Sequence, residues 1–212
     1  MMIGKSLILY VLGFGILLLQ KCMDYDQYCD IKPLTFKGDV KIYPDKNEIS
    51  IGDTIWFVSD IPVTLIEQNS NTSVNYSNAT NFITSISLER MTGGSVNSTG
   101  LDPAANHFKY VVASGSYIAP AEPNIKTNFF RFSEFSDQYS LKIGIIPGST
   151  GIFALRFTSP STVISGSNDC ASALYQLTFK GTDQHIYLYQ NNRPGYIIEG
   201  SEAGNLYCFV VK

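Results

Sequence analysis

The sequence predicts an all-β fold, a β-sandwich of roughly nine strands with at most one short helix. Through most of the 212 residues, apolar side chains recur at every second position, which is the period of a half-buried strand. Clusters of Gly, Asn, Ser and Pro separate these runs, and many short strands with regular turns are typical of a sandwich or a barrel. Only 16% of the residues are charged, a composition that indicates an extracellular β protein.

The first strands are expected soon after the N-terminal segment. Residues 40–43 alternate between apolar and polar, and Ile49 and Ile51 are expected to share one face. Residues 54–58 form a dense apolar run, which predicts a further strand. Trp56 lies in the middle of this run, and we expect it to be a core residue.

The middle of the chain alternates between polar loops and short strands. Residues 68–81 are rich in Asn, Ser and Thr and have no apolar face to bury, so they are expected to form a loop. Residues 82–88 and 108–112 alternate again and are expected to be strands. Between them, Asp102 can cap one short helix with Pro103 at its first position.

The strongest local signal spans residues 139–157, where two alternating runs flank a turn over residues 147–151. This pattern predicts a β-hairpin. The side chains expected to oppose each other are Leu141, Ile143 and Ile145 on one strand and Phe153, Leu155 and Phe157 on the other. Strands over residues 174–179, 186–189 and 206–211 complete the set, and we find no internal repeat and no long linker.

The two ends of the chain resemble a known class of domain. Residues 52–56 (Gly-Asp-Thr-Ile-Trp), preceded by Ile49-x-Ile51 and by a turn at Pro44, resemble the early strand pair of immunoglobulin-like domains in Bacteroidetes surface and periplasmic lipoproteins. Similar chains close with a tyrosine-bearing strand such as residues 207–211. The resemblance implies an immunoglobulin-like β-sandwich. It implies no activity, because this fold hosts many functions.

The first 21 residues are expected to be a signal peptide. Lys5 precedes an apolar run over residues 7–19, which is shorter than the ~20 residues that a membrane-spanning helix needs. The rest of the chain is therefore expected to fold outside the cytoplasm. We divide it into a tether over residues 22–35 and a single domain over residues 36–212.

Cys22 closes the apolar run and is the predicted lipidation site. Leu19 stands three residues before it, as in the bacterial lipoprotein box that this segment resembles, whereas Lys21 replaces the small residue of that pattern. Acylation of Cys22 would anchor the protein to a membrane. The expected location is the outer membrane or the cell surface. The alternatives are an uncleaved anchor and a cleaved, soluble protein in the periplasm or outside the cell.

Cysteines in an exported chain favour disulfide formation over metal binding. If Cys22 carries lipid, the candidates are Cys29, Cys170 and Cys208. Cys29 with Cys170 is the favoured pair, because it would hold the N-terminal segment on the domain and leave Cys208 as a buried free thiol. Cys170 with Cys208 is the alternative, since pairing depends on a Cα separation below about 7 Å that a sequence does not give.

No pattern in the sequence predicts an enzyme, a metal site or a cofactor. The chain has no C-x-x-C pair, and both histidines, His107 and His185, are isolated. The string over residues 113–116 lacks the glycine spacing of a G-x-S-x-G nucleophile elbow, so a hydrolase is only a remote alternative. A net charge of −3 gives no basic patch for phosphate neutralisation, so nucleic acid is not an expected partner.

The remaining features favour a binding or adhesion role toward a glycan or another protein of the cell envelope. Aromatic side chains provide large, rigid contact area at low entropic cost. The candidate ligand-binding residues are Tyr117, Tyr187, Tyr189 and Tyr196. The alternative is a structural subunit that assembles through unprotected sheet edges and binds no small ligand.

Overall fold

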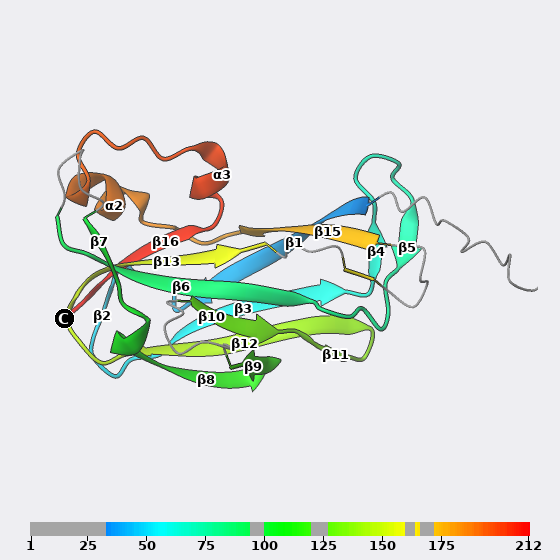
Figure 1. Ribbon diagram of the computed structural model, residues 1–212, viewed down its shortest axis with the longest axis horizontal. Helices are drawn as coiled ribbons and strands as arrows, with labels where there is room; N and C mark the ends of the chain where they lie inside the picture. Colours follow the sequence, from blue (N-terminus) through cyan, green and yellow to red (C-terminus); the bar gives the residue numbers. More distant parts are fainter. Residues whose placement is uncertain (1–32, 94–99, 120–126, 160–163, 166–171) are drawn as a thin grey trace, which may run out of the picture. The chain divides into compact units, whose positions relative to one another are not determined.

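Two β-sheets make up most of the protein, and their inner faces pack against each other (Figure 1). The computed structural model describes residues 33–93, 100–119, 127–159, 164–165 and 172–212. This part of the chain forms sixteen strands, more than the roughly nine expected, because several strands span only two or three residues. The prediction of an all-β, sandwich-like fold is confirmed.

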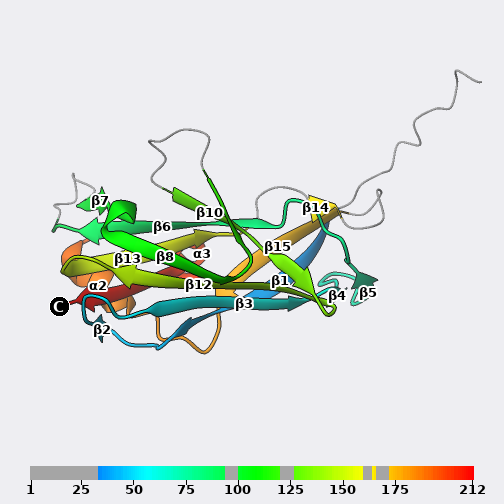
Figure 2. The same ribbon diagram turned by 90° about the horizontal axis from the view of Figure 1, so that it is seen from below.

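The first sheet has seven strands. They are β1 (Pro33–Tyr43), β3 (Ile55–Pro62), β8 (Phe108–Ser114), β11 (Ser133–Phe135), β12 (Gln138–Pro147), β14 (Ile164–Ser165) and β15 (Ser172–Phe179). Their order is β11-β12-β3-β1-β15-β14, and β8 also pairs with β12. Neighbours are antiparallel except for β1 and β15, which run parallel. The strands β8, β12 and β3 therefore lie side by side (Figure 2).

The second sheet also has seven strands. They are β2 (Glu48–Ile49), β6 (Ile83–Met91), β7 (Leu101–Pro103), β9 (Ser116–Ile118), β10 (Thr127–Arg131), β13 (Gly151–Thr158) and β16 (Leu206–Val211). Their order is β2-β16-β13-β6-β10-β9, with β7 beside β6. Ile49 is buried in β2 whereas Ile51 lies exposed in the following turn, so the expectation that they share a face is wrong.

A small separate pair of strands has one member just before the expected loop of residues 68–81 and the other inside it. Strand β4 (Thr64–Ile66) pairs with β5 (Ser73–Asn75). Leu65 of β4 is buried, and Val74 of β5 packs against the core. The loop prediction is therefore wrong at its centre, because one apolar side chain opposite a buried neighbour is enough to hold a three-residue strand.

The core between the two sheets is rich in aromatic side chains. Phe57 of β3 and Phe157 of β13 approach each other from opposite sheets, with ring centroids 5.5 Å apart in an edge-to-face arrangement. Such pairs add about 0.5–1.5 kcal/mol beyond the burial of their area. The largest fully buried side chains are Tyr76, Tyr139, Tyr175, Tyr189, Tyr207, Phe36, Phe57, Phe82, Phe130, Phe153, Phe157 and Phe209.

Strands β12 and β13 do not form the predicted hairpin. Strand β12 pairs with β3, β8 and β11 in the first sheet, and β13 pairs with β6 and β16 in the second. The three residues between them carry the chain from one sheet to the other. The apolar side chains of both strands are buried as expected, but they meet across the core instead of along a shared ladder. Alternation reports which side chains point inward and does not identify the hydrogen-bonding partner.

The chain also crosses between the sheets at Gly115, which separates β8 in the first sheet from β9 in the second. Gly115 has φ +92°, and a Cβ there would lie 2.5 Å from Leu141 Cδ1 and 2.6 Å from the Arg131 carbonyl oxygen. Only glycine fits this conformation and this close approach. The sharp turn at Gly115 therefore lets the chain pass from the first sheet to the second between β8 and β9.

The described part of the structure contains two short α-helices, α2 (Ile186–Asn192) and α3 (Gly200–Ala203), and they differ from two predictions. Residues 186–189, expected to be a strand, form the first turn of α2, and more than one short helix is present. The reason is packing: Tyr189 is fully buried beside Leu206 and Cys208 on the outer side of β16. Tertiary contacts of this kind override the β propensity of an Ile-Tyr-Leu-Tyr run.

The short helix expected after Asp102 begins later in the chain. Asp102 and Pro103 belong to β7, and a single 3-10 turn, η1 (Ala105–His107), follows without a side-chain cap. In the part of the chain that the structure describes, no helix is long and apolar enough to span a membrane.

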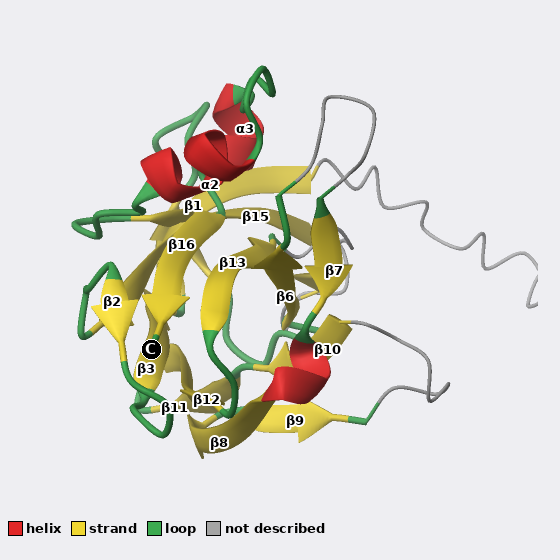
Figure 3. Cartoon of the chain, turned by 90° about the vertical axis from the view of Figure 1, so that its left-hand side faces the viewer, coloured by secondary structure: helices red, strands yellow, loops and turns green. Residues whose placement is uncertain are grey.

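The outer faces of the two sheets differ. Helices α2 and α3 lie on the outer side of the second sheet, next to β16 (Figure 3). No described helix or strand lies over the outer side of β3, β12 and β8 (Figure 3). The first sheet therefore presents an uncovered face.

Candidate functional site

Trp56 lies on the uncovered outer face of the first sheet. Its neighbours in β3, Ile55 and Phe57, are fully buried, whereas Trp56 is only half-buried. The prediction of a core tryptophan is therefore wrong. Residues 54–58 are apolar or β-branched at every position, and a shift of one residue in the alternation moves each side chain to the other face.

A row of four residues crosses the sheet at Trp56. Tyr43 of β1 lies opposite Trp56, Trp56 lies opposite Gly144 of β12, and Gly144 lies opposite Val111 of β8. Directly opposed residues point to the same side of a sheet. Tyr43 is 70% exposed and Val111 is 47% exposed. The row therefore forms a continuous apolar strip across four strands.

Gly144 gives the tryptophan ring its position. A Cβ at Gly144 would lie 3.1 Å from Cζ3 and 3.2 Å from Cη2 of Trp56. The ring edge thus rests directly on the backbone of β12, in space that any other side chain would fill. The absence of a side chain at Gly144 therefore makes room for the ring on the outer face of β12.

The next row adds positive charge. Lys41 of β1 and Lys142 of β12 both lie opposite Val58 of β3. The ammonium group of Lys142 lies 5.0 Å from the centroid of the Trp56 ring, within the range of a cation-π interaction. We call the surface formed by Lys41, Tyr43, Trp56, Val111, Lys142 and Gly144 the Trp56 face.

The four candidate tyrosines do not form one site. Tyr117 belongs to β9 and packs against Phe130, whereas Tyr187, Tyr189 and Tyr196 lie in or after α2, which packs on β16. Strands β13, β6 and β10 separate β9 from β16 in the second sheet.

These tyrosines also differ in how much of each ring a ligand could contact. Tyr189 is 0% exposed, so its ring offers no surface. The hydroxyl of Tyr187 accepts a hydrogen bond of 2.9 Å from the Asn47 amide. The Arg193 guanidinium lies 4.0 Å from the centroid of the Tyr196 ring and covers it. Tyr117 and Tyr187 are similarly exposed, at 47% and 46%, and the Tyr117 hydroxyl donates a hydrogen bond of 3.3 Å to Asn128.

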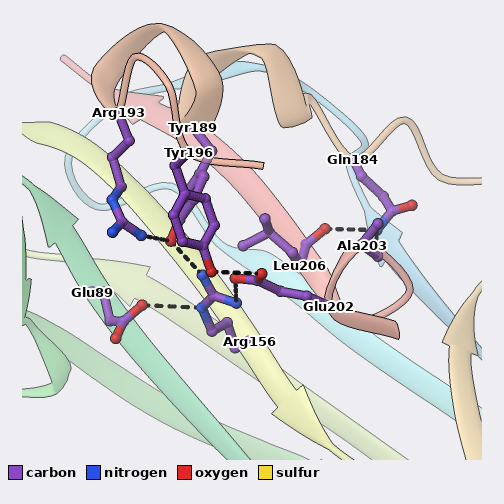
Figure 4. Close-up of polar contacts among 9 residues, drawn as sticks. All are labelled: Glu89, Arg156, Gln184, Tyr189, Arg193, Tyr196, Glu202, Ala203 and Leu206. Atoms are coloured by element: carbon purple, nitrogen blue, oxygen red, sulfur yellow. Dashed lines mark hydrogen bonds and ion pairs between the residues drawn. The ribbon is translucent and has the colours of Figure 1, made fainter. Parts of the chain in front are cut away.

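Tyr189 and Tyr196 belong to a polar network around Arg156 (Figure 4). The guanidinium of Arg156 donates to Glu89 at 3.1 Å, to Glu202 at 2.6 Å and to the Tyr189 hydroxyl at 2.7 Å. Burial lowers the pKa of Arg156, but its contacts with Tyr189, Glu202 and Glu89 outweigh burial and raise that pKa.

The network continues from Tyr189 and Glu202 to α2 and the segment after it. Arg193 donates to the same Tyr189 hydroxyl, and the Tyr196 hydroxyl donates to Glu202 at 2.9 Å (Figure 4). Gln184 donates to the carbonyl oxygens of Ala203 and Leu206. The network ties the helices to the second sheet, and its charged groups already have partners. It does not offer a free group to a ligand.

Neither histidine completes a catalytic triad among the described residues. His107 Nδ1 lies 2.8 Å from the Ser149 hydroxyl, but no described carboxylate contacts His107. His185 is buried, with Nε2 3.5 Å from Asp45 and Nδ1 3.4 Å from Asp183. The described residues also contain no cluster of three or more His, Cys, Asp or Glu suited to a metal ion.

Of the cysteine candidates, only Cys208 lies in the part of the chain that the structure describes. It is a buried free thiol, and burial raises its pKa to about 12. Cys22, Cys29 and Cys170 lie outside the described residues, so the lipidation site and the Cys29 with Cys170 pair stay predictions.

A cavity of about 450 Å³ lies beside α3, between the ends of β13 and β15. Its lining is uncharged and without a titratable side chain; it consists of Thr158, Ser159, Gln176, Leu177, Thr178, Gly200, Gly204 and Asn205. Such a lining can form hydrogen bonds but has no group for acid-base or nucleophilic chemistry.

No protein-family model and no curated protein matches this chain.

Proposed function

We propose that the protein is a glycan-binding module of the cell envelope and that the Trp56 face is its binding surface. The observation that carries this proposal is the strip formed by Tyr43, Trp56, Gly144 and Val111 on an uncovered sheet. No catalytic role is proposed.

The strip suits a sugar ring for two physical reasons. The face of an aromatic ring carries negative potential, which attracts the weakly positive C–H groups on one side of a pyranose. The Trp56 ring is also held in place by the Gly144 backbone, so little conformational freedom is lost when a ligand stacks on it. Lys41 and Lys142 border the strip and can donate hydrogen bonds to the ligand.

The proposal keeps the binding role expected from the sequence but places it on another surface. Tyr189 is buried and Tyr196 is covered by Arg193. Tyr117 is as exposed as Val111, at 47%, but it lies on a strand of the second sheet. Tyr117 therefore serves as a control for the role of Trp56.

The test is affinity electrophoresis in native gels that contain xylan, mannan, alginate or chondroitin sulfate. We expect at least one polysaccharide to retard the wild-type protein, and Trp56→Ala and Tyr43→Ala to abolish that retardation. Tyr117→Ala should migrate like wild type. Circular dichroism verifies that each variant is folded, and Tyr43 is so exposed that its truncation leaves the core intact. Unchanged retardation of folded Trp56→Ala and Tyr43→Ala, or no retardation of wild type, contradicts the proposal.

We also propose that Cys22 is acylated and that the lipid anchors an immunoglobulin-like domain at the outer membrane or cell surface, with a periplasmic or secreted form as the alternative. The support is the apolar run over residues 7–19 followed by Cys22. The intact mass of the protein extracted from membranes tests this. A mature chain that begins at Cys22 and carries acyl chains is expected, and Cys22→Ala should lose them. A mature mass without lipid contradicts acylation.

A second candidate function is assembly with other envelope proteins. Phe135 is 79% exposed on β11, which is an edge strand of the first sheet, and unprotected edges pair readily with other chains. Gel filtration distinguishes the two functions. Self-association that is independent of saccharide and lost in Phe135→Ser favours assembly, whereas a monomer whose elution shifts when saccharide is added favours glycan binding.

A further inference from the structure

Three lysines that have no carboxylate partner among the described residues surround Trp56. Lys41 and Lys142 flank Val58, and Lys109 of β8 lies opposite Ile146 of β12, on the other side of the Trp56 row. All three lysines are exposed. The lysines that form ion pairs in the described residues are Lys180 and Lys212.

This local charge contrasts with that of the whole chain, which has a net charge of −3. Two acidic side chains, Asp39 and Asp60, lie on the same face, and Asp39 is in an ion pair with a lysine outside the Trp56 face. Asp39 pairs with Lys180 at 2.9 Å, and Asp60 accepts a hydrogen bond of 2.6 Å from Ser140. The sheet register thus brings lysines that are dispersed along the chain onto one face, which the net charge of the chain does not indicate.

We infer that the ligand of the Trp56 face is an acidic saccharide, one that carries carboxylate or sulfate groups. This inference rests on the proposed function. Lys41 and Lys142 are separated by two strand spacings, about 10 Å at the backbone, and Trp56 lies in the adjacent row. A sugar ring stacked on Trp56 therefore has an ammonium group within reach on either side, and charge-assisted hydrogen bonds to anionic groups are the stronger kind.

The geometry favours a saccharide over a membrane or a nucleic acid. Trp56 is half-buried against Gly144 instead of projecting from a loop, so it cannot enter a lipid interface without leaving the sheet. The four strands that build the face, β1, β3, β8 and β12, contain no arginine. Arginine is the preferred residue for bidentate recognition of phosphate.

Trp56 itself provides the assay, because it is the only tryptophan of the chain. Its emission is titrated with alginate and chondroitin sulfate oligosaccharides, and with cello-, xylo- and manno-oligosaccharides as neutral probes. We expect the acidic probes to change the emission at low salt and to bind more weakly as the salt concentration rises, because surface charges are screened.

The variants separate charge from aromatic stacking. The double variant Lys41→Gln/Lys142→Gln should weaken binding of the acidic probe about tenfold or more, since it removes hydrogen bonds to charged groups. The matched control Arg131→Gln/Lys212→Gln removes the same charge elsewhere and should bind like wild type. All four residues are exposed, so the variants are expected to fold.

The outcomes distinguish this inference from the proposed function. Equal, salt-independent binding of neutral and acidic probes overturns the acidic class while glycan binding stands. Binding of no saccharide overturns both. A change of Trp56 emission with vesicles of phosphatidylcholine and phosphatidylglycerol, and not with saccharides, replaces the inference with a membrane surface. Equal weakening by both double variants also overturns it, because the effect would then reflect net charge alone.

Discussion

Replacing Gly144 with alanine tests whether the backbone of β12 holds the Trp56 ring. The added Cβ would lie 2.9 Å from Thr54 Cγ2 and 3.1–3.2 Å from two atoms of the Trp56 ring. Real Cβ atoms rarely approach other atoms so closely. The atoms that it meets belong to side chains on the outer face, so the ring and the threonine must move away from the sheet.

The expected cost follows from that geometry. Overpacking typically costs about 1–3 kcal/mol, and the low end applies here because Trp56 and Thr54 can shift toward solvent. In a domain of this size, 1 kcal/mol lowers the melting temperature by about 2–4 °C. Because the ring is displaced, we also expect its fluorescence emission to shift to the red and the affinity for the saccharide to fall.

Thermal unfolding followed by circular dichroism gives the stability, and Trp56 fluorescence gives the position of the ring. The matched control is Gly200→Ala, where the new Cβ has no neighbour within 4 Å. This control should be neutral or slightly stabilising, because alanine reduces the entropy of the unfolded chain. A Gly144→Ala protein with unchanged melting temperature, emission and affinity would refute the role assigned to Gly144.

Three further predictions concern other parts of the molecule. Arg156→Met leaves Glu89 without its cation. We expect the free energy of unfolding, measured in urea, to fall by about 1–3 kcal/mol, since the removed hydrogen bonds involve charged groups. A decrease below 0.5 kcal/mol, the usual limit for surface substitutions, contradicts this. Cys208 should resist iodoacetamide at pH 8 and react once urea is added, because burial raises its pKa to about 12; peptide mapping by mass spectrometry reads the result. Burial raises the pKa values of Tyr76 and Tyr139 to about 12, above the 10.0 of a free tyrosine. Their contribution to the free energy of unfolding is therefore fully present below pH 10 and is lost as the pH rises from 10 toward 12. Absorbance at 295 nm should show that these two tyrosines ionise as the protein unfolds.

Much of the fold could be predicted because inward-facing residues leave a regular pattern. The alternating residues of β12 and β13 are buried as the sequence indicates. The partners of these strands could not be predicted, since a hairpin and a crossing between sheets use the same alternation and a similar turn. Helix α2 was missed because the apolar surface of β16 that it covers is distant in the sequence.

The proposed binding surface could not be predicted from the sequence for a related reason. Tyr43, Trp56, Val111 and Gly144 come from four separate strands, and only the register places them in one row. Trp56 stands in a run without a clear alternation, so its side of the sheet was undetermined. Of the tyrosines chosen instead, Tyr187, Tyr189 and Tyr196 lie in or after α2, where Tyr189 is buried, and Tyr117 lies on β9.

The pairing of β1 with β15 has a consequence for how the chain folds. The ladder joins Pro33 to Ser172 and Val40 to Phe179, so the first described strand finds its neighbour only near the end of the chain. Contacts between residues so far apart in sequence slow folding, because a long loop must close before they form. We therefore expect β1 to stay unpaired on this side until most of the chain has been synthesised. A chain that completes its first sheet so late is suited to export before folding, as the signal peptide expected at residues 1–21 requires.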